Sequence, residues 1–152
     1  MESPERRSWT AAALRVTSAT RSPEGITRTL SLTPSREISL GAPLAPQSPR
    51  SMKSKQHVWI RRIFIDPEAP LGDHLAAVVA LLNEHAVAIA ELSRDCDVDV
   101  SIGFGSESEQ GGDVLSHDII EQLARHPVSL SLDLYPPAAG ALTASDELHN
   151  GG

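Results

Sequence analysis

The chain has little of several residue types, and each scarcity excludes a class of protein. With one cysteine, Cys96, among 152 residues, it forms no internal disulfide and no cysteine-rich zinc site. No apolar run approaches the roughly 18 to 20 residues of a membrane-spanning helix. The start of the chain, MESPERRSWTAAALRV, is a poor signal peptide. We therefore expect a cytoplasmic protein with no membrane partner.

Aromatic residues make up only 3% of the chain, so the core must consist mainly of Leu, Val, Ile and Ala. Positive charge is scarce in the second part: residues 66–152 contain 2 Lys/Arg and 16 Asp/Glu, against 11 and 4 in residues 1–65. This split indicates either a basic surface beside an acidic one or two parts that interleave and neutralise each other. A pI near 5.3, with no aromatic platform interleaved with basic residues, argues against nucleic-acid binding.

The residues that are present form alternating strand and helix patterns. Alternating or β-branched runs predict strands at 10–19, within 33–41, and at 57–65, 96–105 and 128–135. Helices are expected after the cap Ser22, from His74 to Arg94 with Asp73 as cap, and from the cap Ser116 to His126 at most. Residues 10–136 then form one domain between disordered tails at 1–9 and 137–152.

The last two strands decide the fold class. In 96–105, Cys96, Val98 and the following alternate residues are apolar, while the intervening positions are polar. In 128–135, valine and leucines alternate with polar residues and are expected to point inward. One wet face per strand predicts an α+β two-layer sandwich: a mixed or mainly antiparallel sheet of about five strands with two to three helices on one face.

The strand at 57–65 resists assignment of its faces. Trp59 and Ile60 are adjacent and both favour burial, whereas Arg61 and Arg62 are adjacent and both oppose it.

Two motifs that resemble chemical sites fail on spacing. The stretch DCDVDVSIGFGS has aspartates at positions 1, 3 and 5 of a calcium loop, but Val100 replaces the required glycine and Ser106 the required glutamate. Ser116, His117 and Asp118 are adjacent at a helix start, so they cannot form a catalytic relay. The helix-cap interpretation accounts for Ser116 instead.

Histidine, glycine and cysteine give no site either. His74 and His85 are 11 residues apart on the expected helix, which is about 16 Å and too far to share a metal ion. Gly103 and Gly105 precede neither a helix start nor a GK[ST] sequence. Cys96 alternates with Val98, as a buried small apolar residue does. We expect no metal and no cofactor.

The chain contains, in order, the stretches LRVTS, PEGITRTLSLTPSREISLG, VWI, PLGDHLAAVVALL, DVDVSIGF and, most specifically, LSHDIIEQLARHPVSLSLDLY. Together they resemble a bacterial family, domain of unknown function 4279. The resemblance runs from about Ala13 to Pro136. It implies a small bacterial α+β domain and transfers no catalytic residue.

Two functions of different classes remain. The first is a non-catalytic binding module that docks on a protein with a basic surface, as an immunity protein docks on a basic toxin. Its acidic face would comprise Asp97, Asp99, Asp133, Glu107 and Glu109. The alternative is an enzyme whose site is assembled from scattered residues such as His57, Arg61, Arg62 and Glu84. The oligomeric state is open.

Overall fold

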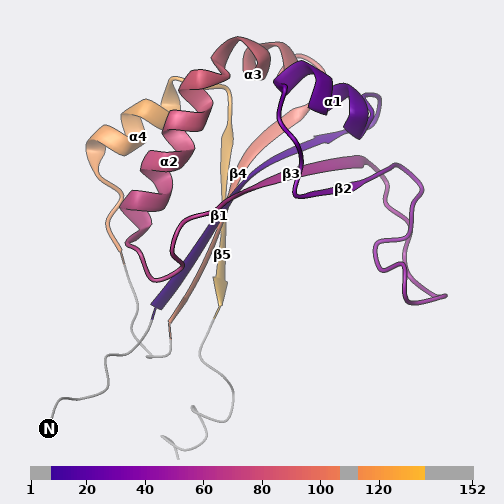
Figure 1. Cartoon of the computed structure of the whole chain (residues 1–152), viewed down its shortest axis with the longest axis horizontal. Helices are drawn as coiled ribbons and strands as arrows, with labels where there is room; N and C mark the ends of the chain where they lie inside the picture. Colours follow the sequence, from indigo (N-terminus) through magenta and orange to yellow (C-terminus); the bar gives the residue numbers. More distant parts are fainter. Residues whose placement is uncertain (1–7, 107–112, 136–152) are drawn as a thin grey trace, which may run out of the picture.

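The computed structural model describes residues 8–106 and 113–135, which form five strands and four helices (Figure 1). In chain order these are β1 Ser8–Ser18, α1 Pro23–Leu30, β2 Arg36–Ile38, β3 His57–Ile63, α2 Leu71–Glu84, α3 Ala86–Leu92, β4 Asp97–Ser106, α4 His117–Ala124 and β5 Ser129–Tyr135. Because β1 begins at Ser8, only residues 1–7 of the predicted N-terminal tail lie outside the described residues. The predicted tail at 137–152 lies outside them entirely.

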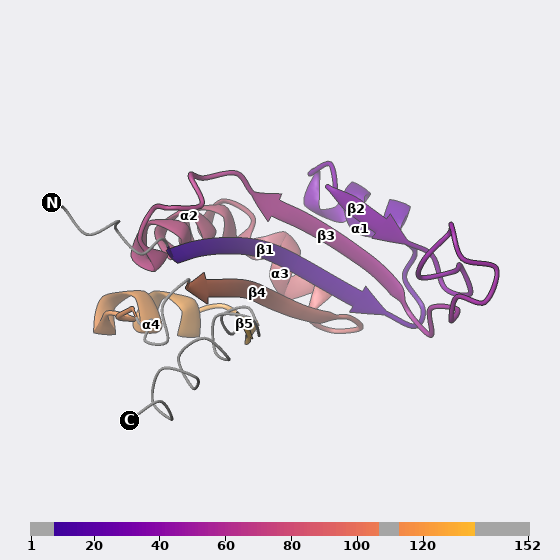
Figure 2. The same cartoon turned by 90° about the horizontal axis from the view of Figure 1, so that it is seen from below.

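The five strands form one open sheet in the order β2-β3-β1-β4-β5. All neighbours are antiparallel except β4 and β5, which are parallel and joined through α4. The helices lie against one face of this sheet (Figures 1 and 2). The predicted α+β fold with a mixed five-stranded sheet is confirmed, although the described residues contain four helices rather than two or three.

The alternation along β1 explains how the central strand separates the two faces. Ala12, Leu14 and Val16 are buried beneath the helices, whereas Arg15 lies on the opposite face. Successive strand residues point to opposite sides of a sheet, so the face with the helices is the apolar core and the other face is open.

Two short helices begin at the serine caps that the sequence predicts. The hydroxyl of Ser22 accepts a hydrogen bond from the amide of Gly25 (3.2 Å), and Pro23 occupies the first helical position of α1. The hydroxyl of Ser116 accepts from the amide of Ile119 (3.2 Å) at the start of α4. Each bond satisfies an amide that has no partner within its helix.

The predicted single helix from His74 to Arg94 is wrong: the segment forms two helices, α2 and α3, bent by 82°. The bend lies at His85, after which α3 packs beside α1 and buries Ile89 and Leu92 in the core. A straight helix would carry these side chains away from the sheet. Neither helix, nor any other in the described residues, is alone long and apolar enough to span a membrane; α2 and α3 meet that length and composition only as a bent pair.

Asp73 is also not the cap of α2. The helix begins at Leu71, and Asp73 lies within its first turn. The Leu71 amide instead donates to the carboxylate of Asp113, 42 residues later in the chain (2.9 Å). Local sequence contains no sign of this partner, because it comes from the segment before α4.

The faces of β3 follow from two hydrogen bonds. Trp59 is fully buried under α1, and its indole nitrogen donates to the Thr27 hydroxyl (2.9 Å). Arg61 lies on the same face, and its guanidinium donates to the carbonyl of Thr33 (2.7 Å). Arg61 can therefore lie on the same side as Trp59, because near the sheet edge its guanidinium donates a hydrogen bond to a loop carbonyl.

The leucines of β5 correct a further expectation. Leu130, Leu132 and Leu134 pair with Val100, Ile102 and Phe104 of β4 and so face the helix side as predicted. They are nevertheless exposed by 40%, 53% and 71%. In Figure 1, α4 lies beside the start of β5, and the strand continues beyond the helix. The alternation predicts on which face these leucines lie, but not whether a helix buries them.

The Ser116 cap can be tested by stability. Ser116→Ala should lower the free energy of unfolding by about 1 kcal/mol, because the Ile119 amide loses its acceptor. Ser116→Asp should stay within about 0.5 kcal/mol of wild type, since a carboxylate also caps and favours the helix dipole. His117→Ala, which changes an exposed neighbour, is the control. Urea unfolding measures all three, and an alanine variant as stable as wild type would exclude the cap.

Candidate interaction surface on the open face

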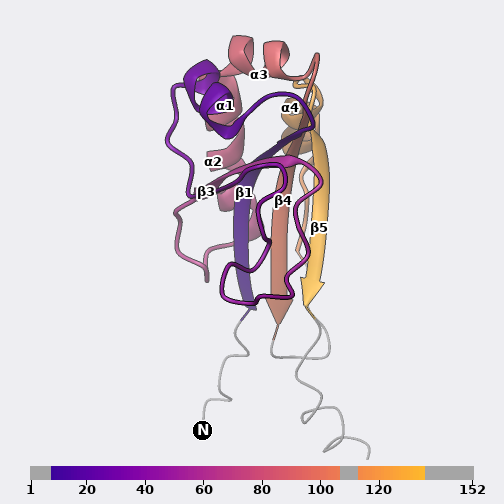
Figure 3. The same ribbon diagram turned by 90° about the vertical axis from the view of Figure 1, so that its right-hand side faces the viewer.

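The open face of the sheet collects side chains from three neighbouring strands, β1, β4 and β5. In the pairing of these strands, positions that face away from the helices lie side by side. We call these positions the open face: Trp9, Ala11, Ala13, Arg15 and Thr17 of β1, Asp97, Asp99, Ser101, Gly103 and Gly105 of β4, and Ser129, Ser131, Asp133 and Tyr135 of β5. The same side of the sheet continues onto β3 with Ile60 and the exposed Arg62. Figure 3 shows the three strands side by side, with β5 at the edge.

A polar cluster of Arg15, Asp99 and Ser131 lies across these strands. Arg15 is directly opposite Asp99 in the β1–β4 register, and its Nη2 donates to Asp99 Oδ2 (2.8 Å). The Ser131 hydroxyl donates to the other carboxylate oxygen (2.8 Å). Asp99 is only 8% exposed, so both oxygens of a nearly buried carboxylate have partners. The cluster holds β1, β4 and β5 in register.

A hollow of about 480 Å³ adjoins this cluster. Its lining is mainly polar and includes Arg15, Thr17, Asp97, Asp99, Ser129 and Ser131. The Nε of Arg15 is buried and has no hydrogen-bond partner within the described ranges. Of the Arg15 guanidinium nitrogens, Nη2 therefore makes the bond to Asp99, while Nε does not take part in it.

The predicted acidic residues lie partly together. Asp97, Asp99 and Asp133 share the open face, as the alternation predicts. Asp97 and Asp133 are exposed, whereas the charge of Asp99 is paired with Arg15. Glu107 and Glu109 lie outside the described residues. The described part of the acidic face thus presents two free carboxylates beside one neutralised pair.

Trp9 and Tyr135 form an aromatic pair on the same face, which the sequence interpretation missed. Their ring centroids are 5.1 Å apart. The indole lies over β4, where Gly103 and Gly105 leave room for it; a Cβ at Gly105 would collide with the indole nitrogen. The available signal was the pair of glycines two residues apart in a strand, since such glycines mark a close approach by another group.

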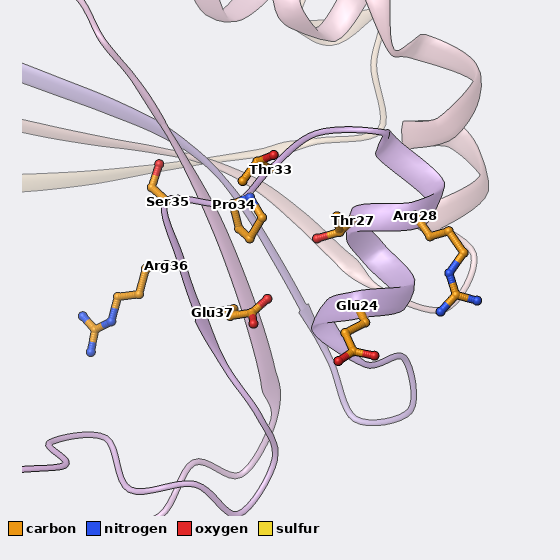
Figure 4. A pocket seen from close by; sticks show the side chains of 8 residues that line it. All are labelled: Glu24, Thr27, Arg28, Thr33, Pro34, Ser35, Arg36 and Glu37. Atoms are coloured by element: carbon orange, nitrogen blue, oxygen red, sulfur yellow. The ribbon is translucent and has the colours of Figure 1, made fainter.

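A second hollow, of about 610 Å³, lies between α1 and β2 (Figure 4). The Glu37 carboxylate points from β2 toward α1 and Glu24 extends from the start of α1, while Arg28 and Arg36 point away. The described residues contain no group of three His, Cys, Asp or Glu side chains arranged to hold a metal ion. This hollow has side chains of both charges in its lining, whereas the open face combines a nearly buried ion pair with an aromatic pair, so we take the open face as the candidate site.

The four residues of the alternative catalytic set are dispersed. His57 Nδ1 accepts from a backbone amide, and Arg61 donates to a backbone carbonyl. Arg62 lies on the other face of β3 from Arg61, and Glu84 is exposed at the end of α2. Among the described residues, no hydrogen bond or ion pair joins any two of the four.

The two helical histidines have separate surroundings. His74 is 1% exposed, and its Nε2 is 3.1 Å from the carbonyl oxygen of Asp66. Because a carbonyl only accepts, Nε2 is the donor in this hydrogen bond. His85 is the residue at which α2 ends and α3 begins. His74 therefore anchors the start of α2 to the preceding loop.

Comparison with known proteins gives a family but no activity. A family model described as "Domain of unknown function (DUF4279)" matches residues 7–137, from β1 through β5. No curated protein and no solved structure matches the chain. A functional conclusion must therefore come from the surfaces of this chain itself.

The Arg15–Asp99 pair can be tested by a double-mutant cycle. Arg15→Met should lower the free energy of unfolding by about 1 kcal/mol, because it leaves a nearly buried carboxylate with one partner. The Arg15 side chain is 42% exposed, so water weakens the ion pair itself and a larger loss is not expected. Adding Asp99→Asn should recover part of the loss, since the buried charge is removed.

Arg28→Met is the matched control for this cycle, because Arg28 is exposed and points away from its hollow. It should change the unfolding free energy by less than about 0.5 kcal/mol. Equal effects of the two arginine variants, or additive effects of Arg15→Met and Asp99→Asn, would show that the pair contributes no coupling.

Cys96 provides a pH-dependent test. Burial raises the pKa of the thiol above its ordinary value of 9.0; a Ser18 hydrogen bond opposes the shift, and the charge of Asp95 adds to it. The folded state therefore keeps the thiol protonated to a higher pH than the unfolded state does. Its contribution to stability is complete below the ordinary pKa and is lost as the pH rises through the raised one.

The stability difference between wild type and Cys96→Ala should accordingly shrink as the pH rises above 9.0, as measured by urea unfolding. Ellman's reagent should also modify Cys96 at least about 10-fold more slowly in the folded protein than in urea. Fast modification of the folded chain, or a stability difference that is constant over this pH range, would contradict the buried-thiol assignment.

Proposed function

We propose that this chain, which belongs to the DUF4279 family, is a non-catalytic interaction module that binds a partner protein with a basic surface on its open face. The exposed Asp97 and Asp133, on neighbouring strands, are the charged contacts. The aromatic pair Trp9 and Tyr135 supplies apolar contact area beside them.

The chemistry of the open face supports binding rather than turnover. A partner can meet the three strands without displacing a helix, because all the described helices lie on the other side. Tryptophan, tyrosine and arginine are enriched where protein interfaces gain most of their energy. The Arg15–Asp99–Ser131 cluster is already hydrogen-bonded, so little ordering is left to occur on binding.

Charge supports the choice of a basic partner. The chain carries a formal charge of −7, and residues 66–152 hold most of its acidic side chains. Opposite charge on a partner accelerates encounter and selects the orientation of docking. A basic toxin held by its acidic inhibitor is one pairing of this kind.

The proposal is tested by charge reversal on the open face. The double variant D97K/D133K should lose the partner that wild type captures from cells of its own source, as identified by quantitative mass spectrometry. With the purified partner, the dissociation constant should rise at least about 10-fold, since two favourable charge contacts become repulsive. Raising the salt concentration should weaken wild-type binding, because exposed charges are screened.

The matched control is D118K/E121K, which makes the same change of charge on exposed positions of α4, on the other side of the sheet. It should retain the partner. If both double variants lose the partner equally, total charge rather than the open face determines binding. If D97K/D133K retains it, the open-face proposal is wrong.

A further inference from the structure

The two edges of the sheet differ in their protection against pairing. β2 has three residues, two of them charged (Arg36 and Glu37), and Pro34 precedes it. Short length, charge and proline all discourage the addition of another strand. The edge strand β5 has seven residues, no proline and no lysine, and its one charged residue is Asp133. Within the described residues, β5 pairs only with β4.

The unprotected edge coincides with the exposed leucines. Leu130, Leu132 and Leu134 occupy alternate positions of β5, and α4 leaves them 40%, 53% and 71% exposed. Ile120 of α4, half exposed, lies in the same region and lines a hollow with Leu130. The edge therefore offers both free backbone groups and a continuous row of apolar side chains.

From this combination we propose that the protein forms a homodimer in which β5 pairs antiparallel with β5 of a second copy, with the two-fold axis at Leu132. In this register Leu132 faces Leu132 of the copy, and Leu130 faces Leu134. All three leucines of each copy then meet leucines on one face. The resulting contact is isologous, as a two-fold axis requires.

Charge and strand length favour this register over the two registers whose two-fold axis lies one residue away. About Leu132, Asp133 lies opposite Ser131 of the copy, whose neighbour Asp99 is already paired with Arg15. A two-fold axis at Asp133 would place two carboxylates directly opposite each other, which is unfavourable. An axis at Ser131 would leave Leu134 opposite Val128, outside the strand.

The sequence favours a second copy over residues 136–152 as the occupant of this edge. Pro136 and Pro137 directly follow β5, and proline cannot donate a backbone hydrogen bond to a neighbouring strand. Residues 138–152 contain only two large apolar residues, Leu142 and Leu148, against three leucines in β5. The sequence SLSLDLY, by contrast, complements itself.

The test uses three forms of the full chain: wild type, L132K and L132E. Light scattering coupled to size exclusion should give wild type twice the 16.2 kDa mass of one chain. Each variant alone should be monomeric, with dimerisation weakened by at least about 100-fold, because like charges face each other at the axis. An equimolar mixture of L132K and L132E should again form dimers, since opposite charges then meet.

Val87→Lys is the control, because Val87 is 85% exposed on α3, away from β5. It should remain dimeric, and circular dichroism should show all variants folded. A monomeric wild type at 200 µM, a dimeric L132K, or a mixture that stays monomeric would each overturn the proposal. A dimer lost equally in Val87→Lys would also overturn it, by placing the interface elsewhere. If wild type is monomeric and only a foreign peptide adds to β5, the edge serves another partner and not a second copy.

Discussion

The register between β1 and β4 is the constraint on which the rest of the structure depends. β1 is the central strand, and its backbone pairs with β3 on one side and β4 on the other. A slip of one residue would bring Leu14 and Val16 to the open face and Arg15 into the apolar core. Burying an unpaired guanidinium is costly. The ion pair of Arg15 with Asp99 is made only in the correct register, so packing and charge select the same alignment.

This register also explains the uneven distribution of charge along the chain. Arg15 comes from the basic first part and Asp99 from the acidic second part, and the two parts interleave where β1 meets β4. Arg21, three residues after the end of β1, likewise binds Asp95, two residues before the start of β4 (3.0 Å). These pairs neutralise part of the asymmetry. Asp97 and Asp133 are exposed and form no ion pair within the described residues, so they are the carboxylates left available on the β4 and β5 part of the open face.

Sequence patterns predict the features that depend on residues close in the chain. The caps at Ser22 and Ser116 and the alternation in β1 and β4 all follow from spacing. The bend at His85 does not, because the apolar stripe continues across it and the turn is required by the packing of α3 against α1 and β4. The helix start at Leu71 depends on Asp113, and the exposure of Leu132 depends on the length of α4. Those are relations between distant segments.

In the candidate site, too, sequence patterns predict the local features and miss those that depend on distant segments. Alternation places Asp97, Asp99 and Asp133 on one face, but only the pairing of β1 with β4 reveals that Arg15 neutralises Asp99. Trp9 could not be placed from its own surroundings, which are polar; its position follows from Gly105, almost a hundred residues later. A strand-rich surface is assembled from non-local neighbours, so its charge pattern cannot be read from any single segment.

The two proposed surfaces are compatible because they use different sides of β5. Partner binding uses the open face, with Asp133 and Tyr135, whereas self-pairing uses the strand edge and the leucines on the helix side. A β5–β5 dimer would continue the sheet and place two open faces next to each other. A partner with two basic sites, or two linked partners, would then bind with an effective concentration set by the dimer rather than by bulk solution. Self-association would thus strengthen a modest electrostatic contact without any new residue on the open face.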